Sequence, residues 1–183
     1  MMDVETPKLG QRIAVIGCSG SGKSTLAQAL AKAKGIPYVN ADGLLFCDSN
    51  WTERPKTEFY ALIQQHLAGD SFTYDGNIGG SQQIVLPRID TLIWLDYPRH
   101  FVMRRLLWRT IHRAWTKQPL YAGCTESWRM SFASRDSILL YAWRSHGKRK
   151  AQYEALWPTL DPAITKVRVR NQAQCDAMLQ AVL

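Results

Sequence analysis

Eight consecutive residues, Gly17 to Ser24, have the types and the spacing needed to hold a chain of phosphates. They read GCSGSGKS and match the pattern G-x-x-x-x-G-K-[ST] without a gap. Glycines let the backbone turn so that successive N–H groups face one anion, and the lysine adds a positive charge. The segment therefore predicts a binding site for a nucleoside triphosphate, formed by Gly17, Gly20, Ser21, Gly22, Lys23, Ser24 and Thr25.

The residues on either side of this pattern would place it between a strand and a helix. The apolar, β-branched run 13–16 precedes it and predicts a strand that is buried on both faces. Apolar residues at helical spacing follow from Ser24, and Gly35 stands where such a helix would end. The Lys23 ammonium would then reach the last two phosphates, and the Ser24 hydroxyl would hold Mg²⁺.

The rest of the chain alternates between helical and strand-like segments, which indicates a parallel sheet covered on both faces. Further strands are expected around 37–40, 72–75, 91–97 and 164–169, and helices around 56–68, 98–115, 134–145, 148–156 and 173–182. We therefore expect an α/β fold, that of a P-loop NTPase with three α/β/α layers, a five-stranded parallel sheet and a helical lid. Residues 1–183 are expected to form one domain, with the lid inserted at about 110–150.

Three aspartates stand where they could act beside bound phosphates. Magnesium commonly takes a second ligand from the end of a neighbouring strand, and Asp75 and Asp96 each end a predicted strand. Asp42 follows the strand at 37–40, where it could accept a proton from an attacking hydroxyl or orient that group. It could equally be a turn or capping residue, and an acceptor that is already a phosphate would need no base.

Positive charge is concentrated in one part of the chain. The 183 residues carry a net charge of +8, and the stretch 99–150 holds 12 lysines and arginines against two acidic residues. Such a field attracts the phosphates of a nucleotide or of a nucleic acid. Three arginines of the expected lid are candidates for contacts to the β- and γ-phosphates: Arg129, Arg135 and Arg144.

We expect most of the large aromatic residues to pack rather than to bind. Phe46 and Trp51 could form the wall of an acceptor pocket, although packing in the core is favoured. Four tryptophans are expected to pack the helices of the lid: Trp108, Trp115, Trp128 and Trp143.

The composition and the spacing of the cysteines argue against several other classes of protein. Apolar residues make up 46% and charged residues 21%, as in soluble globular proteins, and no apolar run approaches the roughly 18 residues of a membrane span. No basic segment followed by an apolar one begins the chain, and its four cysteines include no C-x-x-C pair. We therefore expect a cytoplasmic protein with reduced thiols and no membrane partner.

The order of these segments resembles the nucleoside monophosphate kinases and their shikimate and gluconate kinase relatives. In adenylate kinase an Asp-Gly pair ends the third strand near the metal, and Asp75 and Gly76 match that pair. The group also carries two arginines four residues apart on the helix after its D-x-P motif, and Arg105 and Arg109 fall in that register. Residues i and i+4 share a helix face, so both guanidinium groups could clamp one transferring phosphoryl group.

The chain departs from adenylate kinase directly after this pair. That enzyme has Phe-Pro-Arg, whereas Asn77, Ile78 and Gly79 occupy these places here. Arg88 lies downstream and could replace the missing charge. A glycine-rich loop at this point is closer to the shikimate kinase pattern, in which a small hydroxylated acceptor binds. Acceptor contacts are therefore expected from Asp42, Gly76, Asn77 and Arg88.

Over nearly its whole length the chain also resembles the bacterial DNA topology modulation proteins, an adenylate-kinase-like family. The likeness rests on YDGN at 74–77, Arg88 before IDTLIWLDYPR, RLLWRT at 105–110 and GCTESW at 123–128. Asn171 and Gln172 stand where relatives hold adenine, largely through backbone atoms.

Two functions are compatible with these observations, and the first is favoured. The first is a kinase that moves the γ-phosphoryl group of ATP to a nucleoside monophosphate or another small acceptor. Lys23, Arg105 and Arg109 would stabilise charge in it, while Ser24 and Asp75 would hold Mg²⁺. The second is a nucleic-acid-binding P-loop NTPase involved in DNA topology, for which no recognisable nucleic-acid-binding motif is visible. The sequence does not determine the oligomeric state.

Overall fold

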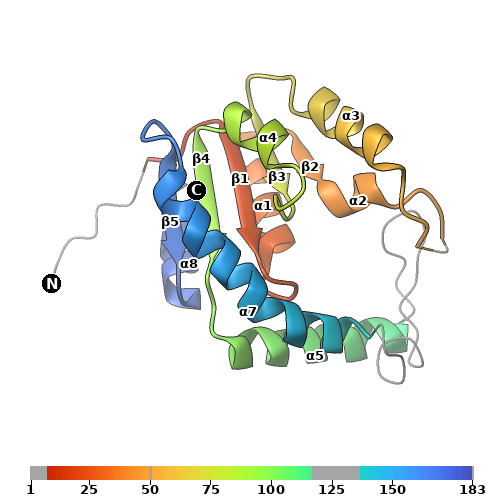
Figure 1. The fold of residues 1–183 in the computed structure, drawn as a ribbon. Helices are drawn as coiled ribbons and strands as arrows, with labels where there is room; N and C mark the ends of the chain where they lie inside the picture. Colours follow the sequence, from red (N-terminus) through yellow and green to blue (C-terminus); the bar gives the residue numbers. More distant parts are fainter. Residues whose placement is uncertain (1–7, 50, 117–136, 183) are drawn as a thin grey trace, which may run out of the picture.

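Five parallel strands form one sheet at the centre of the molecule (Figure 1). The computed structural model describes residues 8–49, 51–116 and 137–182. The strands are β1 (Arg12–Gly17), β2 (Tyr38–Asn40), β3 (Phe72–Asp75), β4 (Thr91–Leu95) and β5 (Thr165–Val169). Their order across the sheet is β2-β3-β1-β4-β5, and each neighbouring pair is parallel.

Helices cover both faces of this sheet, which confirms the expected three-layer α/β/α fold of a P-loop NTPase. The helices are α1 (Lys23–Lys34), α2 (Ala41–Leu45), α3 (Lys56–His66), α4 (Gln82–Val85), α5 (Arg99–Thr116), α7 (Ile138–Leu156) and α8 (Gln172–Gln180). Buried residues of α1 and α8 pack on one face, and those of α3, α4 and α7 pack on the other. Among the residues that the structure describes, no helix is both long and apolar enough to cross a bilayer.

The central strand β1 is apolar throughout because both of its faces are covered. Ile13 and Val15 point into the core under α1 and α8, whereas Ala14 and Ile16 point into the core under α3 and α7. All four side chains are fully buried. An unbroken apolar run is typical of such a doubly covered parallel strand, and it fixes the position at which the glycine-rich segment leaves the sheet.

The helices differ from the sequence-based expectation in three places. The short helices α2 and α4 were not expected. The two helices expected at 134–145 and 148–156 are a single helix, α7, which runs through Gly147. A glycine costs a helix about 1 kcal/mol, and here the packing of α7 against the sheet and α5 outweighs that cost. The residues at 117–136 within the expected lid lie outside the described residues.

The aromatic residues also depart from the expectation that they pack in the core. Phe46 and Trp51 lie outside both buried clusters and contact each other edge to face, with ring centroids 5.1 Å apart. Trp108, Trp115 and Trp143 are exposed, so the expectation that they pack lid helices is wrong for these three.

The contact between α2 and the end of β3 leaves no room for a side chain at Gly76. A Cβ atom there would lie 2.5 Å from the Cβ atom of Ala41. We expect Gly76→Ala to lower the free energy of unfolding by about 1–3 kcal/mol, because an added carbon in a packed contact forces its neighbours apart. Urea denaturation measures this change.

Gly69→Ala is the matched control for that substitution. A Cβ atom at Gly69 would lie 3.8 Å from the nearest atom, the Ser71 carbonyl oxygen, which is an ordinary contact. Its free energy of unfolding should stay within about 0.5 kcal/mol of the wild type. Equal unfolding midpoints for the two variants would contradict the close contact at Gly76.

Candidate nucleotide and acceptor site

The loop between β1 and α1 is shaped by three glycines in the left-handed region of backbone conformation. Gly17, Gly20 and Gly22 have φ angles of 154°, 83° and 94°, which residues with a Cβ atom rarely adopt. A Cβ atom on Gly17 would lie 2.8 Å from the Ser21 hydroxyl oxygen and 2.9 Å from the Leu95 carbonyl oxygen. The loop therefore stays free of side chains on this side, as a backbone cradle for an anion requires.

Polar side chains of this loop are available to a ligand. The buried Ser21 hydroxyl has no hydrogen-bond partner among the described residues, and a buried polar atom normally has one. The Lys23 ammonium donates to the Cys18 carbonyl oxygen at 3.3 Å. Ser24 is half-buried and Thr25 is exposed in the first turn of α1. The loop thus offers a cation and hydroxyls at the positive end of a helix.

Helix α5 packs directly on the loop and brings Arg105 to it. A Cβ atom on Gly20 would lie 2.9 Å from the Cβ atom of Leu106, so the helix and the loop are in close contact. The Arg105 guanidinium lies 3.6 Å from the position of a Cβ atom on Gly22 and donates to the Gln172 side-chain oxygen at 3.0 Å. The arginine predicted to act on phosphates and one residue of the predicted adenine site therefore lie together.

Asp75 ends β3 next to the phosphate-binding loop. Its Cα pairs in register with that of Val15 on β1, and its side chain is buried. The Tyr38 hydroxyl donates to one carboxylate oxygen of Asp75 at 2.9 Å and accepts from the Asn40 side-chain amide at 3.0 Å. Burial of the phenol, followed by the charge of Asp75, raises the pKa of Tyr38. The hydroxyl therefore stays protonated and acts as a neutral donor that orients this carboxylate.

Asp42 lies in the first turn of α2, beside the end of β3. The cap of this helix is Asn40, whose side-chain oxygen accepts from the Gly43 backbone N–H at 2.9 Å, so Asp42 is not the capping residue. The close contact between Ala41 and Gly76 brings the start of α2 against the segment that follows Asp75. The carboxyl of Asp42 is therefore free of a capping role and faces the candidate site.

Four charged groups act electrostatically on the carboxyl of Asp42. Desolvation by the surrounding protein raises the pKa of Asp42, although the residue itself is exposed to solvent. The charges of Lys23, Arg109 and Arg149 oppose that increase, with Lys23 the strongest, and the charge of Asp75 adds to it. One carboxyl group is thus influenced by charges from four parts of the fold: the phosphate-binding loop, β3, α5 and α7.

Arg149 is a candidate site residue that the sequence analysis did not single out. A Cβ atom on Gly79 would lie 3.2 Å from Nη1 of Arg149, while Nη2 of the same guanidinium donates to the Tyr141 hydroxyl at 3.3 Å. One turn further along α7, the Tyr153 hydroxyl donates to the Asn77 side-chain oxygen at 2.7 Å. In the sequence, the one signal that could have marked Arg149 is its place in the basic run at 148–150.

Arg88 does not join this group, and its expected contact with an acceptor is corrected by the structure. It precedes β4, whereas the phosphate-binding loop follows β1, so in a parallel sheet the two lie at opposite edges. Its guanidinium donates to the carbonyl oxygens of Leu67, Ala68 and Gly69 at the end of α3. Arg88 therefore donates hydrogen bonds to carbonyl groups that have no partner within the helix at the end of α3.

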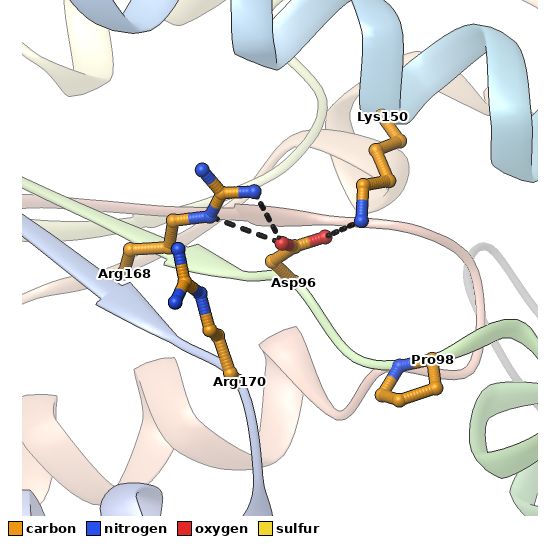
Figure 2. A pocket seen from close by; sticks show the side chains of 5 residues that line it. All are labelled: Asp96, Pro98, Lys150, Arg168 and Arg170. Carbon is orange, nitrogen blue, oxygen red and sulfur yellow. Dashed lines mark hydrogen bonds and ion pairs between the residues drawn. The ribbon is translucent and has the colours of Figure 1, made fainter.

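Asp96, the other aspartate at a strand end, is neutralised by two cations (Figure 2). Its side chain is 6% exposed and lies 2.6 Å from the Arg168 guanidinium and 3.5 Å from the Lys150 ammonium. These residues line a pocket of about 360 Å³ together with Pro98 and Arg170. Because both carboxylate oxygens are already paired, Asp75 is the better placed of the two aspartates for a metal ion.

The remaining predicted site residues fall in different places. Arg129 and Arg135 lie outside the described residues, and Arg144 is exposed on α7. Asn171 caps α8, with its side-chain oxygen accepting from the Gln174 backbone N–H at 2.9 Å. Its side chain therefore caps the helix, so its backbone atoms remain for contact with an adenine base.

The residues present fit a nucleoside triphosphate and Mg²⁺. The side-chain-free loop and the unpartnered Ser21 hydroxyl suit phosphate oxygens, and Lys23 supplies the positive charge. Ser24 and Asp75 are oxygen ligands of the kind that Mg²⁺ takes from proteins, with waters and phosphates completing its shell. These residues would hold the two groups.

Comparison with solved structures shows the same fold in P-loop kinases. A gluconokinase from Sinorhizobium meliloti 1021 matches with a TM-score of 0.51 and 17% identity, over 96% of this chain and 95% of that one. A shikimate kinase from Acinetobacter baumannii, solved with shikimate, matches with a TM-score of 0.58 and 13% identity, over 94% and 90% of the two chains. At these identities the likeness shows that the fold is shared with these two kinases.

Comparison of sequences adds a partial match. A tRNA dimethylallyltransferase from Jannaschia sp. (strain CCS1) is 33% identical over 91 residues, which is 48% of this chain and 31% of that protein. The chain thus matches about a third of the length of this curated relative. No family model matches the chain. The resemblance to the DNA topology modulation proteins stays a prediction.

The contact between Tyr38 and Asp75 leads to a test of how the candidate metal-binding carboxylate is held. We expect Tyr38→Phe to lower the free energy of unfolding by about 1.5–3 kcal/mol, because a buried carboxylate loses a hydrogen bond. We also expect the Mg²⁺ concentration that half-saturates ATP turnover to rise several-fold, because Asp75 loses its orientation. Urea denaturation and Mg²⁺ titrations measure these effects, with Tyr60→Phe on α3 as the control. An unchanged Mg²⁺ dependence would contradict this role of Tyr38.

Proposed function

We propose that this chain is an ATP-dependent phosphotransferase that moves the γ-phosphoryl group to a hydroxyl of a small, negatively charged acceptor. The observation that carries this proposal is the glycine loop with its unpartnered Ser21 hydroxyl and Lys23, next to Asp75, where the charges of Lys23, Asp75, Arg109 and Arg149 act on the carboxyl of Asp42. Phosphoryl transfer uses groups of these kinds: a cation from the phosphate-binding loop, a candidate metal ligand, two arginines and a candidate base.

Each residue of this group has a distinct role in the proposed reaction. Lys23 and the loop amides hold the triphosphate, while Arg105 and Arg109 offset the negative charge that moves toward the leaving oxygen. Asp42 accepts the proton of the attacking hydroxyl, and Arg149 binds the negative group of the acceptor. Mg²⁺, held by Ser24 and Asp75, would neutralise charge on the phosphates.

The choice of a hydroxyl acceptor over a phosphate acceptor is supported by the segment that follows Asp75. The arginine of adenylate kinase is missing at 77–79, and Arg88 is engaged at the end of α3. The position of Asp42 among three cations instead suits a base for a hydroxyl group. The matched gluconokinase and shikimate kinase are named for hydroxylated acids, which are the natural first acceptors to test.

The phosphate-binding role of Lys23 is tested by removing its charge. We expect Lys23→Ala to lower ATP turnover by at least about 100-fold, because no other residue of the loop supplies a positive charge to the phosphates. Turnover is measured in a coupled assay with gluconate, shikimate and nucleoside monophosphates as acceptors. Lys32→Ala, at an exposed position of α1, should turn over ATP like the wild type. Equal turnover in all three proteins would refute the assignment.

The proposed base gives the reaction a defined dependence on pH. Because desolvation raises the pKa of Asp42, and because the base acts only when ionised, kcat should fall as pH drops through a value above the ordinary pKa of about 3.9.

We expect Asp42→Asn to lower kcat by about 100- to 10,000-fold and to remove this acidic limb of the pH profile. Asp70→Asn, at an exposed loop position, removes the same charge and should leave the profile unchanged. Undiminished transfer to a nucleoside monophosphate by Asp42→Asn would mean that the acceptor is a phosphate and that no base is needed.

A further inference from the structure

A pocket of about 360 Å³ lies between α7 and the ends of β4 and β5 (Figure 2). Its lining residues come from this helix and from the ends of the two strands: Asp96, Pro98, Lys150, Arg168 and Arg170. Three of these five side chains are cationic and one is anionic. The proposed transfer reaction uses none of them, so the transfer does not explain why they gather here.

The Arg168 side chain is fixed in place by contacts on several sides. Its guanidinium donates twice to one carboxylate oxygen of Asp96, at 3.0 Å and 2.6 Å, and once to Glu154 at 3.2 Å. It also lies over the ring of buried Trp94, 4.1 Å from the ring centroid. This wall of the pocket is therefore formed in advance, which lowers the entropic cost of binding a ligand.

Arg170 supplies donors that are available to a ligand. Its backbone N–H donates to the Gln174 side-chain oxygen at 2.8 Å, whereas its guanidinium has no hydrogen bond or ion pair within residues 8–49, 51–116 and 137–182. Figure 2 shows this guanidinium turned toward Arg168 and Asp96, although the residue is exposed. A guanidinium carries five N–H donors and no acceptor, so its partner at the pocket must be an acceptor of hydrogen bonds.

The charges at the pocket leave an excess that one phosphate group would balance. Asp96 cancels one of the three cations, and Glu154, which contacts Arg168, cancels part of the remainder. The excess is thus one to two positive charges, whereas a phosphate monoester carries about −1.5 to −2 at pH 7. A cleft with an excess of one sign of charge also raises the local concentration of the opposite ion.

The directions of the donors favour a tetrahedral anion over a planar carboxylate. In Figure 2 the Lys150 ammonium approaches Asp96 from α7 above, and the Arg170 guanidinium approaches from the end of β5 below. The oxygens of a phosphate point in several directions and could accept from both cations, whereas the two oxygens of a carboxylate lie on one side of the group.

The size of the pocket leaves room for more than a free phosphate ion. A volume of about 360 Å³ falls within the range of sites for small molecules, and Pro98 offers an apolar contact for an organic part. We propose that this pocket binds a small phosphate monoester, with Arg170 and Lys150 as the cations that contact the phosphate group.

The pocket and the nucleotide site lie on different faces of the sheet. Arg168 stacks on Trp94, which belongs to the core under α3 and α7. Arg105 and Gln172, which contact each other beside the phosphate-binding loop, extend from α5 and α8, and these helices pack on the core of the other face. The proposed monoester site is therefore independent of the proposed kinase reaction.

Isothermal titration calorimetry of the whole chain with ribose 5-phosphate tests the proposal. The Arg170→Ala protein should bind at least about tenfold more weakly, because charge-assisted hydrogen bonds are lost. Lys166→Ala removes an exposed cation of β5 outside the pocket and should bind like the wild type. The thermal unfolding midpoint of Arg170→Ala should not change, because its side chain has no partner among the described residues.

The phosphate-binding loop also attracts phosphates, so the comparison is repeated in the Lys23→Ala protein. There Arg170→Ala should cause the same loss of affinity, since Lys23 does not line the pocket. Binding of ribose 5-phosphate that depends on Arg170, without any ATP turnover, would leave this proposal intact and count against the kinase alone.

The charge of the ligand gives the binding a defined dependence on pH. The second pKa of a phosphate monoester is about 6, so affinity should fall about fourfold from pH 7.5 to pH 5.5 as the dianion is protonated. Sulfate stays a dianion over this range and controls for titration of the protein. It should displace ribose 5-phosphate equally well at both pH values.

Inorganic phosphate distinguishes the two sources of the phosphate group. It should bind more weakly than ribose 5-phosphate, and tighter binding would assign the pocket to the free ion and overturn the monoester. Four further results would overturn the proposal: unchanged affinity in Arg170→Ala, equal binding of ribose itself, a loss of affinity caused by Lys23→Ala alone, and tighter binding of malonate, a dicarboxylate.

Discussion

The candidate site depends on one constraint, which is that helices pack closely on the loop after β1. Gly17, Gly20 and Gly22 leave this loop without side chains at three positions. α5 contacts the loop at Gly20, and α7 reaches it where the Cys18 thiol lies 3.9 Å from the His146 carbonyl oxygen. Burial is the main cause of the raised pKa of the Cys18 thiol, which therefore stays neutral. A side chain at Gly20 would push α5 away and, with it, the arginines that this helix carries.

Two aspartates at equivalent strand ends show how partners, and not position, decide what a carboxylate can do. Asp96 is paired with Arg168 and Lys150, so its charge is balanced inside the protein. Asp75 accepts a hydrogen bond from the neutral Tyr38 hydroxyl, which orients the carboxylate without cancelling its charge. A buried carboxylate that is oriented but not neutralised by that contact keeps its attraction for a cation.

The sequence predicted those parts of the site that depend on local order along the chain. The five-stranded parallel sheet and the three layers follow from alternating apolar segments, and these predictions are confirmed by the fold. The loop at 17–24 joins adjacent residues, so local order along the chain was enough to mark it. The choice between Asp75 and Asp96 and the placement of Arg149 depend on contacts across many tens of residues, such as that between Arg168 and Asp96. Arg88 was misplaced for the same reason, because nothing local reveals that it binds carbonyl groups at the end of α3.

Helix α7 connects the nucleotide half and the acceptor half of the candidate site. His146 contacts the Tyr97 carbonyl oxygen after β4 at 3.2 Å, and Arg149, one turn later, and Tyr153, two turns later, reach the segment that follows β3. A movement of α7 would therefore shift the cation beside Asp42 and the packing on the phosphate-binding loop together. Since α7 is a single unbroken helix, its contacts with the segment after β3 and with the loop would shift together, which would link binding of the proposed acceptor to the arrangement around a triphosphate.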